Sequence, residues 1–295
     1  MTHRQATTGI YLRLAVVPAI WGGTFIAGRV LALAMPPAVG SLLRYVAASV
    51  ALLAAALWAE GRLPRLDRRQ LLATLALGAT GIFAYNLFFL GALSRLPASR
   101  SSLIVALNPV VTIAAASWLF GERLSPRRWV GVALALAGVW IVVTGGDPLE
   151  LLAGAVGAGE LMMFGAICCW AAYTLIGRSI RGLTPLAATC YASLFGTVML
   201  AIAAAPGLPA LDPAALTAGV VGAILYLGVL GTAVAFVWYY RAVQVLGPAR
   251  TVIFNNLVPV FGAVFGVSLL DEPLSASMLA GGVIAVAGVM VVSRR

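Results

Sequence analysis

The segment LPASRSSLIVALNPVV (residues 96–111) occurs again in altered form as LGPARTVIFNNLVPVF (residues 246–261), without gaps and at a spacing of 150 residues. A shorter match, at a spacing of 149, aligns WGGTFIAGR (residues 21–29) with WAAYTLIGR (residues 170–178). Matches that recur at one spacing over much of a chain predict two copies of one structural unit. The copies must therefore share a fold.

The composition indicates that this fold lies in a membrane. Hydrophobic residues make up 62% of the chain and charged residues 9%, which is too apolar for a soluble protein of this length. The apolar residues form runs of about 20, long enough to cross a hydrocarbon core of about 30 Å as helices. They do not alternate as β-barrel strands would. We expect an all-α integral membrane protein with ten transmembrane helices, at residues 11–33, 38–59, 70–92, 98–119, 126–144, 159–181, 184–205, 213–240, 249–270 and 274–293.

The distribution of charge predicts the orientation of these helices. All 19 basic residues are arginines. If the N-terminus lies inside, fifteen of them fall on the inner side, only Arg29, Arg95 and Arg100 fall on the outer side, and Arg44 lies within the second helix. The positive-inside rule then places both termini in the cytoplasm. The net charge of +10 is thus a sign of topology, and we expect no nucleic-acid partner.

Two copies of five helices predict an inverted arrangement. Because five is odd, the second copy enters the membrane from the opposite side, so that a two-fold axis in the membrane plane relates the halves. We expect a first five-helix repeat at residues 1–146, an outer linker at residues 147–158 and a second repeat at residues 159–295. Inverted repeats without a large soluble domain are typical of secondary transporters that work by alternating access.

Motifs in both halves resemble a known family. The W…G motif opens each half, NP and VP lie in helices four and nine, and GERLS (residues 121–125) aligns with DEPLS (residues 271–275). Together these features resemble the EamA family of the drug/metabolite transporter superfamily over essentially the whole chain, and within it the YddG-type aromatic amino-acid exporters most. The resemblance implies export of aromatic or other neutral amino acids and related metabolites across a bacterial inner membrane. A broader drug or metabolite efflux carrier, coupled to protons, is the alternative.

Aromatic residues near helix centres are the first candidates for a substrate site, since tryptophan and tyrosine are common at membrane interfaces and uncommon at the midplane. Trp21 and Trp170 occupy matching positions, and Tyr173 follows Trp170 on the same helical face. Tyr85 lies in the third helix. We expect these four residues to line a cavity, with packing in the core as the alternative for the two tryptophans.

Amides in hydrocarbon are the second group of candidates, because an amide without a partner there is costly. Asn86, Asn108, Asn255 and Asn256 are predicted to contact substrate; hydrogen bonding between helices is the alternative. Pro109 and Pro259 interrupt helices four and nine near mid-membrane, so we expect bends there that act as hinges.

Several kinds of residue and motif are absent, and their absence narrows the functions that the chain can have. No acidic residue, lysine or histidine lies near a helix centre, which favours uncoupled facilitated diffusion. Arg44 is the exception, and we expect it to snorkel outward rather than pair with a substrate carboxylate. No serine near a histidine, paired-carboxylate motif or set of metal ligands is present, so we expect no enzyme, cofactor or metal site. The expected partners are a small-molecule substrate and the lipid bilayer, and we expect a monomer.

The stripes Gly131, Ala135, Gly138 and Gly281, Ala285, Gly288 lie at matching positions in helices five and ten. Small residues at this spacing let two helices approach closely. We expect these stripes to be helix contacts and not part of the site.

Overall fold

The computed structural model describes residues 3–121, 125–147, 156–246, 251 and 253–293, and every regular element in this part of the chain is helical. Eight helices are long and apolar enough to cross a membrane: Gly9–Ala34, Pro37–Glu60, Arg68–Leu93, Ala98–Leu119, Pro126–Thr144, Ala158–Ser179, Pro185–Ala204 and Ala218–Tyr239. Two shorter apolar helices follow, Phe254–Leu270 and Ala276–Val292. The ten segments overlap the ten expected spans one for one, and most of their bounds differ by only a few residues.

The elements that form the first half of the chain are α1 (His3–Ala34), α2 (Pro37–Glu60), α3 (Arg68–Leu77), η1 (Gly78–Ala84), α4 (Tyr85–Leu93), α5 (Ala98–Val105), α6 (Asn108–Phe120) and α7 (Pro126–Thr144). Those of the second half are α9 (Ala158–Ser179), α10 (Pro185–Ala204), η2 (Leu208–Ala210), η3 (Pro213–Ala215), α11 (Ala218–Leu225), η4 (Tyr226–Val234), α12 (Ala235–Leu246), η5 (Ile253–Leu257), α14 (Val258–Leu270) and α15 (Ala276–Ser293). The eighth span was expected from residue 213, but residues 213–215 form a short 3₁₀ helix and the membrane helix starts at Ala218.

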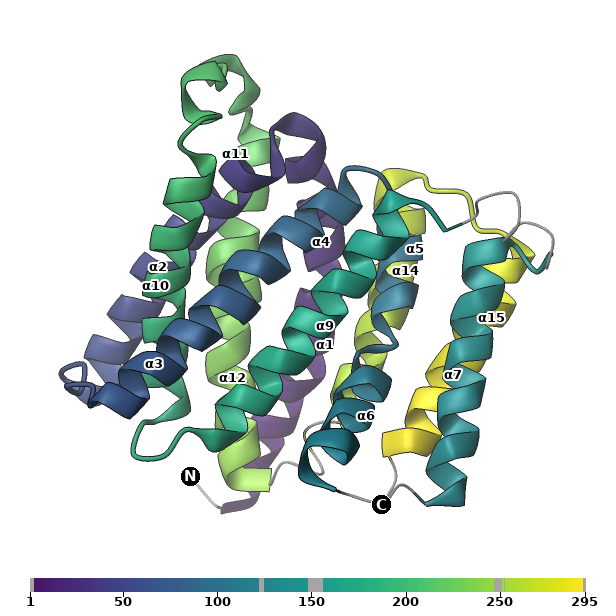
Figure 1. Ribbon diagram of the computed structural model, residues 1–295, viewed down its shortest axis with the longest axis horizontal. Helices are drawn as coiled ribbons and strands as arrows, with labels where there is room; N and C mark the ends of the chain where they lie inside the picture. The colour runs from purple at the N-terminus through teal and green to yellow at the C-terminus, as the bar shows by residue number, and fades with distance from the viewer. Residues whose placement is uncertain (1–2, 122–124, 148–155, 247–250, 252, 294–295) are drawn as a thin grey trace.

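The two halves interleave in one bundle (Figure 1). Helix α2 packs against α10, α5 against α14, and α7 against α15, so each of these pairs takes one helix from each half. Both chain ends lie at the same end of the bundle. Neither half could bury its apolar faces in this way without the other.

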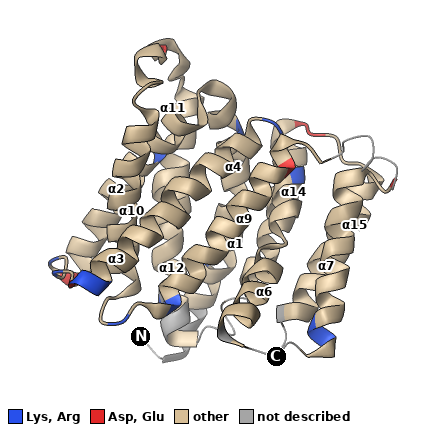
Figure 2. Cartoon of the chain, viewed as in Figure 1, with Lys and Arg blue, Asp and Glu red and all other residues tan. Residues whose placement is uncertain are grey.

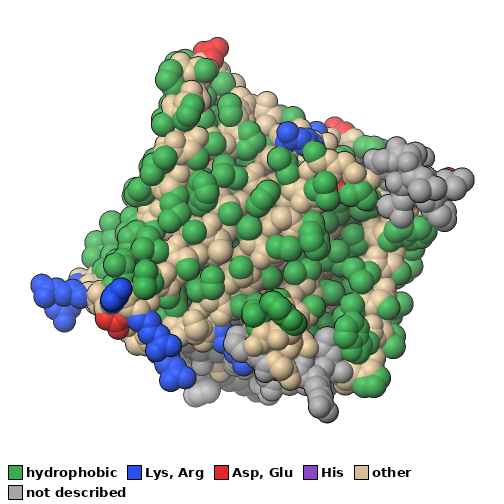
Figure 3. All heavy atoms as spheres, in the orientation of Figure 1, with side chains coloured by type: hydrophobic (Ala, Val, Ile, Leu, Met, Phe, Trp, Pro, Cys, Tyr) green, Lys and Arg blue, Asp and Glu red, His purple; other side chains and the backbone are tan. Residues whose placement is uncertain are grey.

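The charges mark the two ends of the bundle (Figure 2). Arginine gathers in the loop after α2, at the start of α7 and at the end of α9, at the end that also holds the termini. On the face shown in Figure 3, the surface between these ends is mostly apolar. Outward-facing side chains on five helices are largely exposed: Leu12, Val50, Ile202, Leu269 and Val283. So continuous an apolar surface suits lipid and not water.

Helix interruptions occur at corresponding places in both halves. The third and eighth spans each contain a π-helical segment, at Gly78–Ala84 and Tyr226–Val234. The fourth span breaks between Val105 and Asn108, and the segment that precedes α14 is the 3₁₀ helix η5. π segments and 3₁₀ turns inside long helices often mark functional positions.

The small-residue stripes of α7 and α15 form a close helix contact, as expected. A Cβ atom on Gly138 would lie 2.3 Å from the backbone nitrogen of Ala285, and one on Gly288 would lie 2.3 Å from that of Ala135. Because no real side-chain carbon fits at that distance, the backbones touch along this line. The prediction of a packing role for the stripes is confirmed.

Candidate functional site

A continuous cluster of aromatic rings lies where helices of the two halves meet. We call it the ring cluster. It contains Trp21 and Phe25 of α1, Tyr85 and Phe89 of α4, Trp170 and Tyr173 of α9, and Phe236 and Tyr239 of α12.

Phe236 joins the two tryptophans of the repeated motif. Its ring centroid lies 5.8 Å from that of Trp21 and 6.3 Å from that of Trp170, both in edge-to-face geometry. Trp170 also stacks on Tyr173 at 5.4 Å and lies 5.4 Å from Tyr85. These distances are those of favourable aromatic pairs. The cluster therefore forms one connected apolar surface.

The middle of this surface is not fully buried. Phe25 and Phe89, at one end of the cluster, are 3% and 1% exposed. Trp21, Tyr85 and Trp170 are only half-buried, although each lies well inside its span. Aromatic faces that are partly accessible inside a helix bundle are available to an apolar ligand.

The two tryptophans differ in hydrogen bonding. The indole N–H of Trp21 donates to the carbonyl of Gly231 at 3.0 Å. The indole N–H of Trp170 donates to no acceptor in the described part of the chain, and it is not among the fully buried polar atoms. It is therefore an accessible donor, which a substrate oxygen can satisfy.

Glycines in the π segments let α9 approach the third span and α1 approach the eighth span closely. A Cβ atom on Gly81 would lie 2.1 Å from the ring of Tyr173, and one on Gly231 would lie 2.8 Å from the side chain of Thr24. Gly81 and Gly231 are 150 residues apart, and Thr24 and Tyr173 are matched in the WGGTFIAGR repeat. The same contact is therefore built twice, with a ring in one half and a methyl group in the other.

The asparagines do not form one group. Asn255 joins the ring cluster, because its side-chain nitrogen donates to the Tyr239 hydroxyl at 3.3 Å and its oxygen is buried without a partner. Asn86 is 0% exposed and donates to the carbonyl of Ile82 at 2.6 Å, which holds it inside its own helix. Asn108 has a side-chain oxygen without a partner, and Asn256 is 7% exposed. In the described part of the chain, no side-chain hydrogen bond joins Asn86, Asn108 or Asn256 to the ring cluster.

Sequence reasoning missed half of the cluster. Phe25, Phe89 and Phe236 carry no polar group that would single them out in an apolar span, and Tyr239 was expected to belong to the interfacial aromatic belt. A usable signal was present: Phe236 is 150 residues beyond Asn86, and Tyr239 is 150 beyond Phe89. The repeat spacing thus marks which positions of α12 face the interior.

Arg44 does not snorkel, so that expectation is wrong. The side chain is 5% exposed, and its guanidinium lies 5.1 Å from the centre of the Tyr45 ring. Among the described residues its side chain makes one hydrogen bond, a long contact of 3.5 Å from Nη2 to the Thr232 hydroxyl. The eighth span packs closely against this part of α2: a Cβ atom on Gly228 would lie 2.5 Å from the carbonyl oxygen of Arg44. This packing holds the side chain inside the bundle.

The two prolines lie at the helix interruptions. Pro109 is the second residue of α6 and Pro259 is the second residue of α14. Before α6 the chain tightens, with the amide of Leu107 donating to the carbonyl of Ile104 at 3.0 Å. The hydroxyl of Ser102 donates to the carbonyl of Pro259 at 3.2 Å, which links the two broken helices. Regular α-helix is therefore interrupted just before each proline, as the sequence predicted, and the role of the prolines as hinges stays a prediction.

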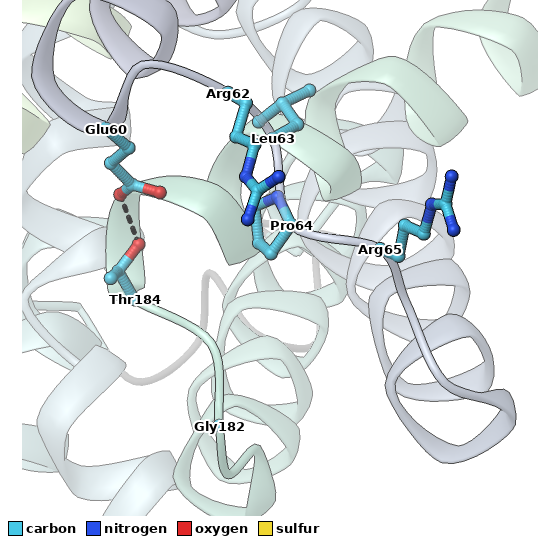
Figure 4. Close-up of a pocket in the computed structure, with 7 residues that line it drawn as sticks. All are labelled: Glu60, Arg62, Leu63, Pro64, Arg65, Gly182 and Thr184. Atoms are coloured by element: carbon cyan, nitrogen blue, oxygen red, sulfur yellow. Dashed lines mark hydrogen bonds between the residues drawn. The ribbon is translucent and has the colours of Figure 1, made fainter.

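A separate pocket lies at the arginine-rich end, between the loop after α2 and the loop before α10 (Figure 4). It is lined by Glu60, Arg62, Leu63, Pro64, Arg65, Gly182 and Thr184. Glu60 accepts a hydrogen bond from the Thr184 hydroxyl across it. Arg62 and Arg65 are exposed. This pocket lies beyond the membrane helices and shares no residue with the ring cluster. No group of three potential metal ligands occurs in the described residues.

Comparison with known proteins identifies the family. The EamA-like transporter family matches residues 8–144 and again residues 157–294. The chain belongs to this family. Membership makes this EamA protein a multi-pass membrane transporter, a class that fits the expectation that it is not an enzyme.

Individual relatives differ in what is known of them. This chain is 32% identical to a probable terminal-alkyne amino-acid exporter of Streptantibioticus cattleyicolor. The alignment spans 257 residues and covers 86% of this chain and 83% of the relative. The chain is 26% identical to the uncharacterized transporter YyaM of Bacillus subtilis, over 96% of this chain and 93% of that protein. It is 29% identical to the uncharacterized inner membrane transporter YedA of Escherichia coli, over 92% and 87%.

A solved crystal structure supports the fold of this EamA protein. It superposes with a TM-score of 0.69 at 20% identity and covers 97% of both chains. The match to the family model confirms the EamA resemblance inferred from the sequence. Nothing in these comparisons favours the YddG-type exporters in particular.

Proposed function

We propose that this EamA protein is a secondary transporter that exports amino acids, aromatic or other neutral ones and related metabolites, across the bacterial inner membrane. The observation that carries the proposal is the ring cluster, with the unpaired indole N–H of Trp170 and the unpaired oxygen of Asn255 at its edge. An aromatic surface with a few directed polar groups suits a small amphipathic solute. The amino-acid exporter among the relatives supports the same substrate class.

In this proposal Trp21, Tyr85, Trp170, Tyr173 and Asn255 contact the substrate in the state described. Asn86, Asn108 and Asn256 form contacts only in another state of the transport cycle. Unpaired buried oxygens on Asn86 and Asn108 support this assignment, because such groups gain a hydrogen bond when the helices rearrange.

The transport cycle we propose is alternating access between two inverted repeats, residues 1–146 and 159–295. The linker at residues 147–158 lies largely outside the described residues. Pro109 and Pro259 serve as the hinges, because each follows an interruption at which the helix can bend without breaking regular hydrogen bonds. The matched interruptions in both halves support a cycle in which the halves exchange conformations.

We further propose that transport is uncoupled facilitated diffusion by a monomer. Each of the nine acidic residues lies in or beside a loop, so no carboxylate stands in the middle of a span to bind a coupling ion. A broader drug or metabolite efflux carrier, driven by protons, remains the competing function.

Flux in proteoliposomes tests the proposal. Purified protein is reconstituted without a pH difference, and entry of labelled L-phenylalanine down its gradient is compared with protein-free vesicles. We expect flux that a protonophore leaves unchanged and that neutral amino acids inhibit. Flux that requires a pH difference, or inhibition by cationic dyes but not by amino acids, would favour the competing carrier.

A further inference from the structure

Arg44 is a buried cation without an ion-pair partner in the described part of the chain. Of its three guanidinium nitrogens, Nε is fully buried and unbonded, and Nη2 has only the 3.5 Å contact with Thr232. Nη1 makes no hydrogen bond and is not among the fully buried atoms, so it faces accessible space. Other arginines are better satisfied: Arg100 pairs with Glu160 at 2.6 Å. A buried charge that lacks a partner is costly, and such residues in membrane spans usually serve function.

The fold does not require this charge. Gly228 meets the carbonyl of Arg44 and the Cβ of Ala47, and this contact recurs in the other half, where Gly78 meets the carbonyl of Ala192 and the Cβ of Phe195. Ala192 thus occupies in α10 the place of Arg44 in α2. Since alanine is sufficient at the equivalent helix contact, the guanidinium of Arg44 has a role other than packing.

Arg44 is directed toward the ring cluster. Its contact residue, Thr232, follows Gly231, whose carbonyl accepts the Trp21 indole N–H. Phe236, which touches both tryptophans, lies four residues beyond Thr232, on the same side of the helix. The Tyr85 hydroxyl lies within electrostatic range of the guanidinium. The cation and the rings therefore belong to one site.

We propose that Arg44 binds the carboxylate of the substrate while the apolar part of the substrate packs on the ring cluster. The proposal rests on the function proposed above and narrows it to solutes that carry both a carboxylate and an apolar body. An arginine fork is well suited to a carboxylate, and in a site of low dielectric the pair is strong. The substrate thereby supplies the charge partner that the described part of the chain lacks.

A comparison of L-phenylalanine with its amide tests this. The two differ in the carboxylate but share the ring and the amine. In wild-type protein we expect L-phenylalanine to be carried about 10- to 100-fold better than the amide, the range for one charge-assisted contact. In Arg44→Gln this ratio should fall close to one. Because the ratio is taken within each variant, differences in yield or folding cancel.

Arg100→Gln is the matched control. It also removes a guanidinium from the outer half of the protein, but one that is already paired with Glu160. It should keep the wild-type ratio. Arg44→Lys, which keeps the charge but not the fork, should give an intermediate ratio.

Binding measured without flux separates the two proposals. 3-Phenylpropionate has the carboxylate and no amine, and phenethylamine has the amine and no carboxylate. We expect the first alone to raise the melting temperature of the detergent-solubilised wild-type protein. Equal effects of both compounds, or phenylalanine flux equal to that of the amide, would overturn the role of Arg44 and leave the transporter proposal standing. If 3-phenylpropionate stabilises the protein but no amino acid is carried, the function is wrong and the carboxylate site stands.

Discussion

The two repeated tryptophans show what a residue pattern can and cannot predict. Their recurrence at a spacing of 149 placed both in the interior, and the structure joins them through Phe236. The sequence could not reveal that the indole N–H of Trp21 is hydrogen-bonded while that of Trp170 has no acceptor among the described residues, because the acceptor of Trp21 lies 210 residues away, in a π segment. Both side chains are half-buried, so the choice between a ligand surface and core packing stays a prediction for the substitutions below.

This difference gives a matched pair of substitutions. Trp21→Phe removes a hydrogen bond and should lower the unfolding free energy by about 1 kcal/mol. Trp170→Phe removes a donor that has no partner in the described part of the chain, so the melting temperature in detergent should stay unchanged while the KM for L-phenylalanine rises. A lowered melting temperature in Trp170→Phe with normal transport would show that Trp170 is packed and does not contact substrate.

Truncation of Trp170 extends the test. If the residue lines an accessible site, Trp170→Ala should reduce flux strongly and stability little, because no closed void forms. A packed tryptophan would instead leave a cavity costing about 3 to 5 kcal/mol.

At the scale of elements, the lengths of the apolar runs predicted the membrane helices, and the prolines predicted where two of them are interrupted. Ten runs of the right length gave the spans to within a few residues, except at the start of the eighth, where Pro213 begins a 3₁₀ turn. Pro109 and Pro259 predicted the interruptions. The π segments could not be foreseen, because they depend on the close approach of Gly78 and Gly228 to distant helices. No local propensity encodes that contact.

The contact between α7 and α15 provides a test at this scale. Gly138→Ala places a Cβ atom 2.3 Å from the Ala285 nitrogen, so the helices must separate, and we expect destabilisation by roughly 1 to 3 kcal/mol. Gly222→Ala, in α11, meets no atom within 4 Å and is the control. It should leave the melting temperature unchanged or raise it, because alanine favours a helix. Equal melting temperatures for the two variants would show that the backbones of α7 and α15 do not touch as described.

For the whole molecule, the repeat spacing and the arginine distribution predicted the arrangement before any contact was known. The structure shows helices of the two halves paired across one bundle, with both ends of the chain on the arginine-rich side. The sequence could not show that the two matched contacts differ in kind. The Gly231 carbonyl accepts the Trp21 indole N–H, whereas Gly81 lies against the ring of Tyr173, and each partner comes from a distant helix.

The orientation in the membrane follows from these same charges and is open to a direct test. In a variant with Cys168, Cys169 and Cys190 replaced, single cysteines are placed at position 147, after α7, and at position 65, in the arginine-rich loop. Both positions are exposed. An impermeant maleimide added to intact spheroplasts should label position 147 and reach position 65 only after lysis, because arginine-rich loops stay in the cytoplasm. The reverse pattern would place the termini outside. Labelling of both positions in intact spheroplasts would mean that the helices between them, α3 to α7, do not cross the membrane an odd number of times, and the inverted arrangement would fail with them.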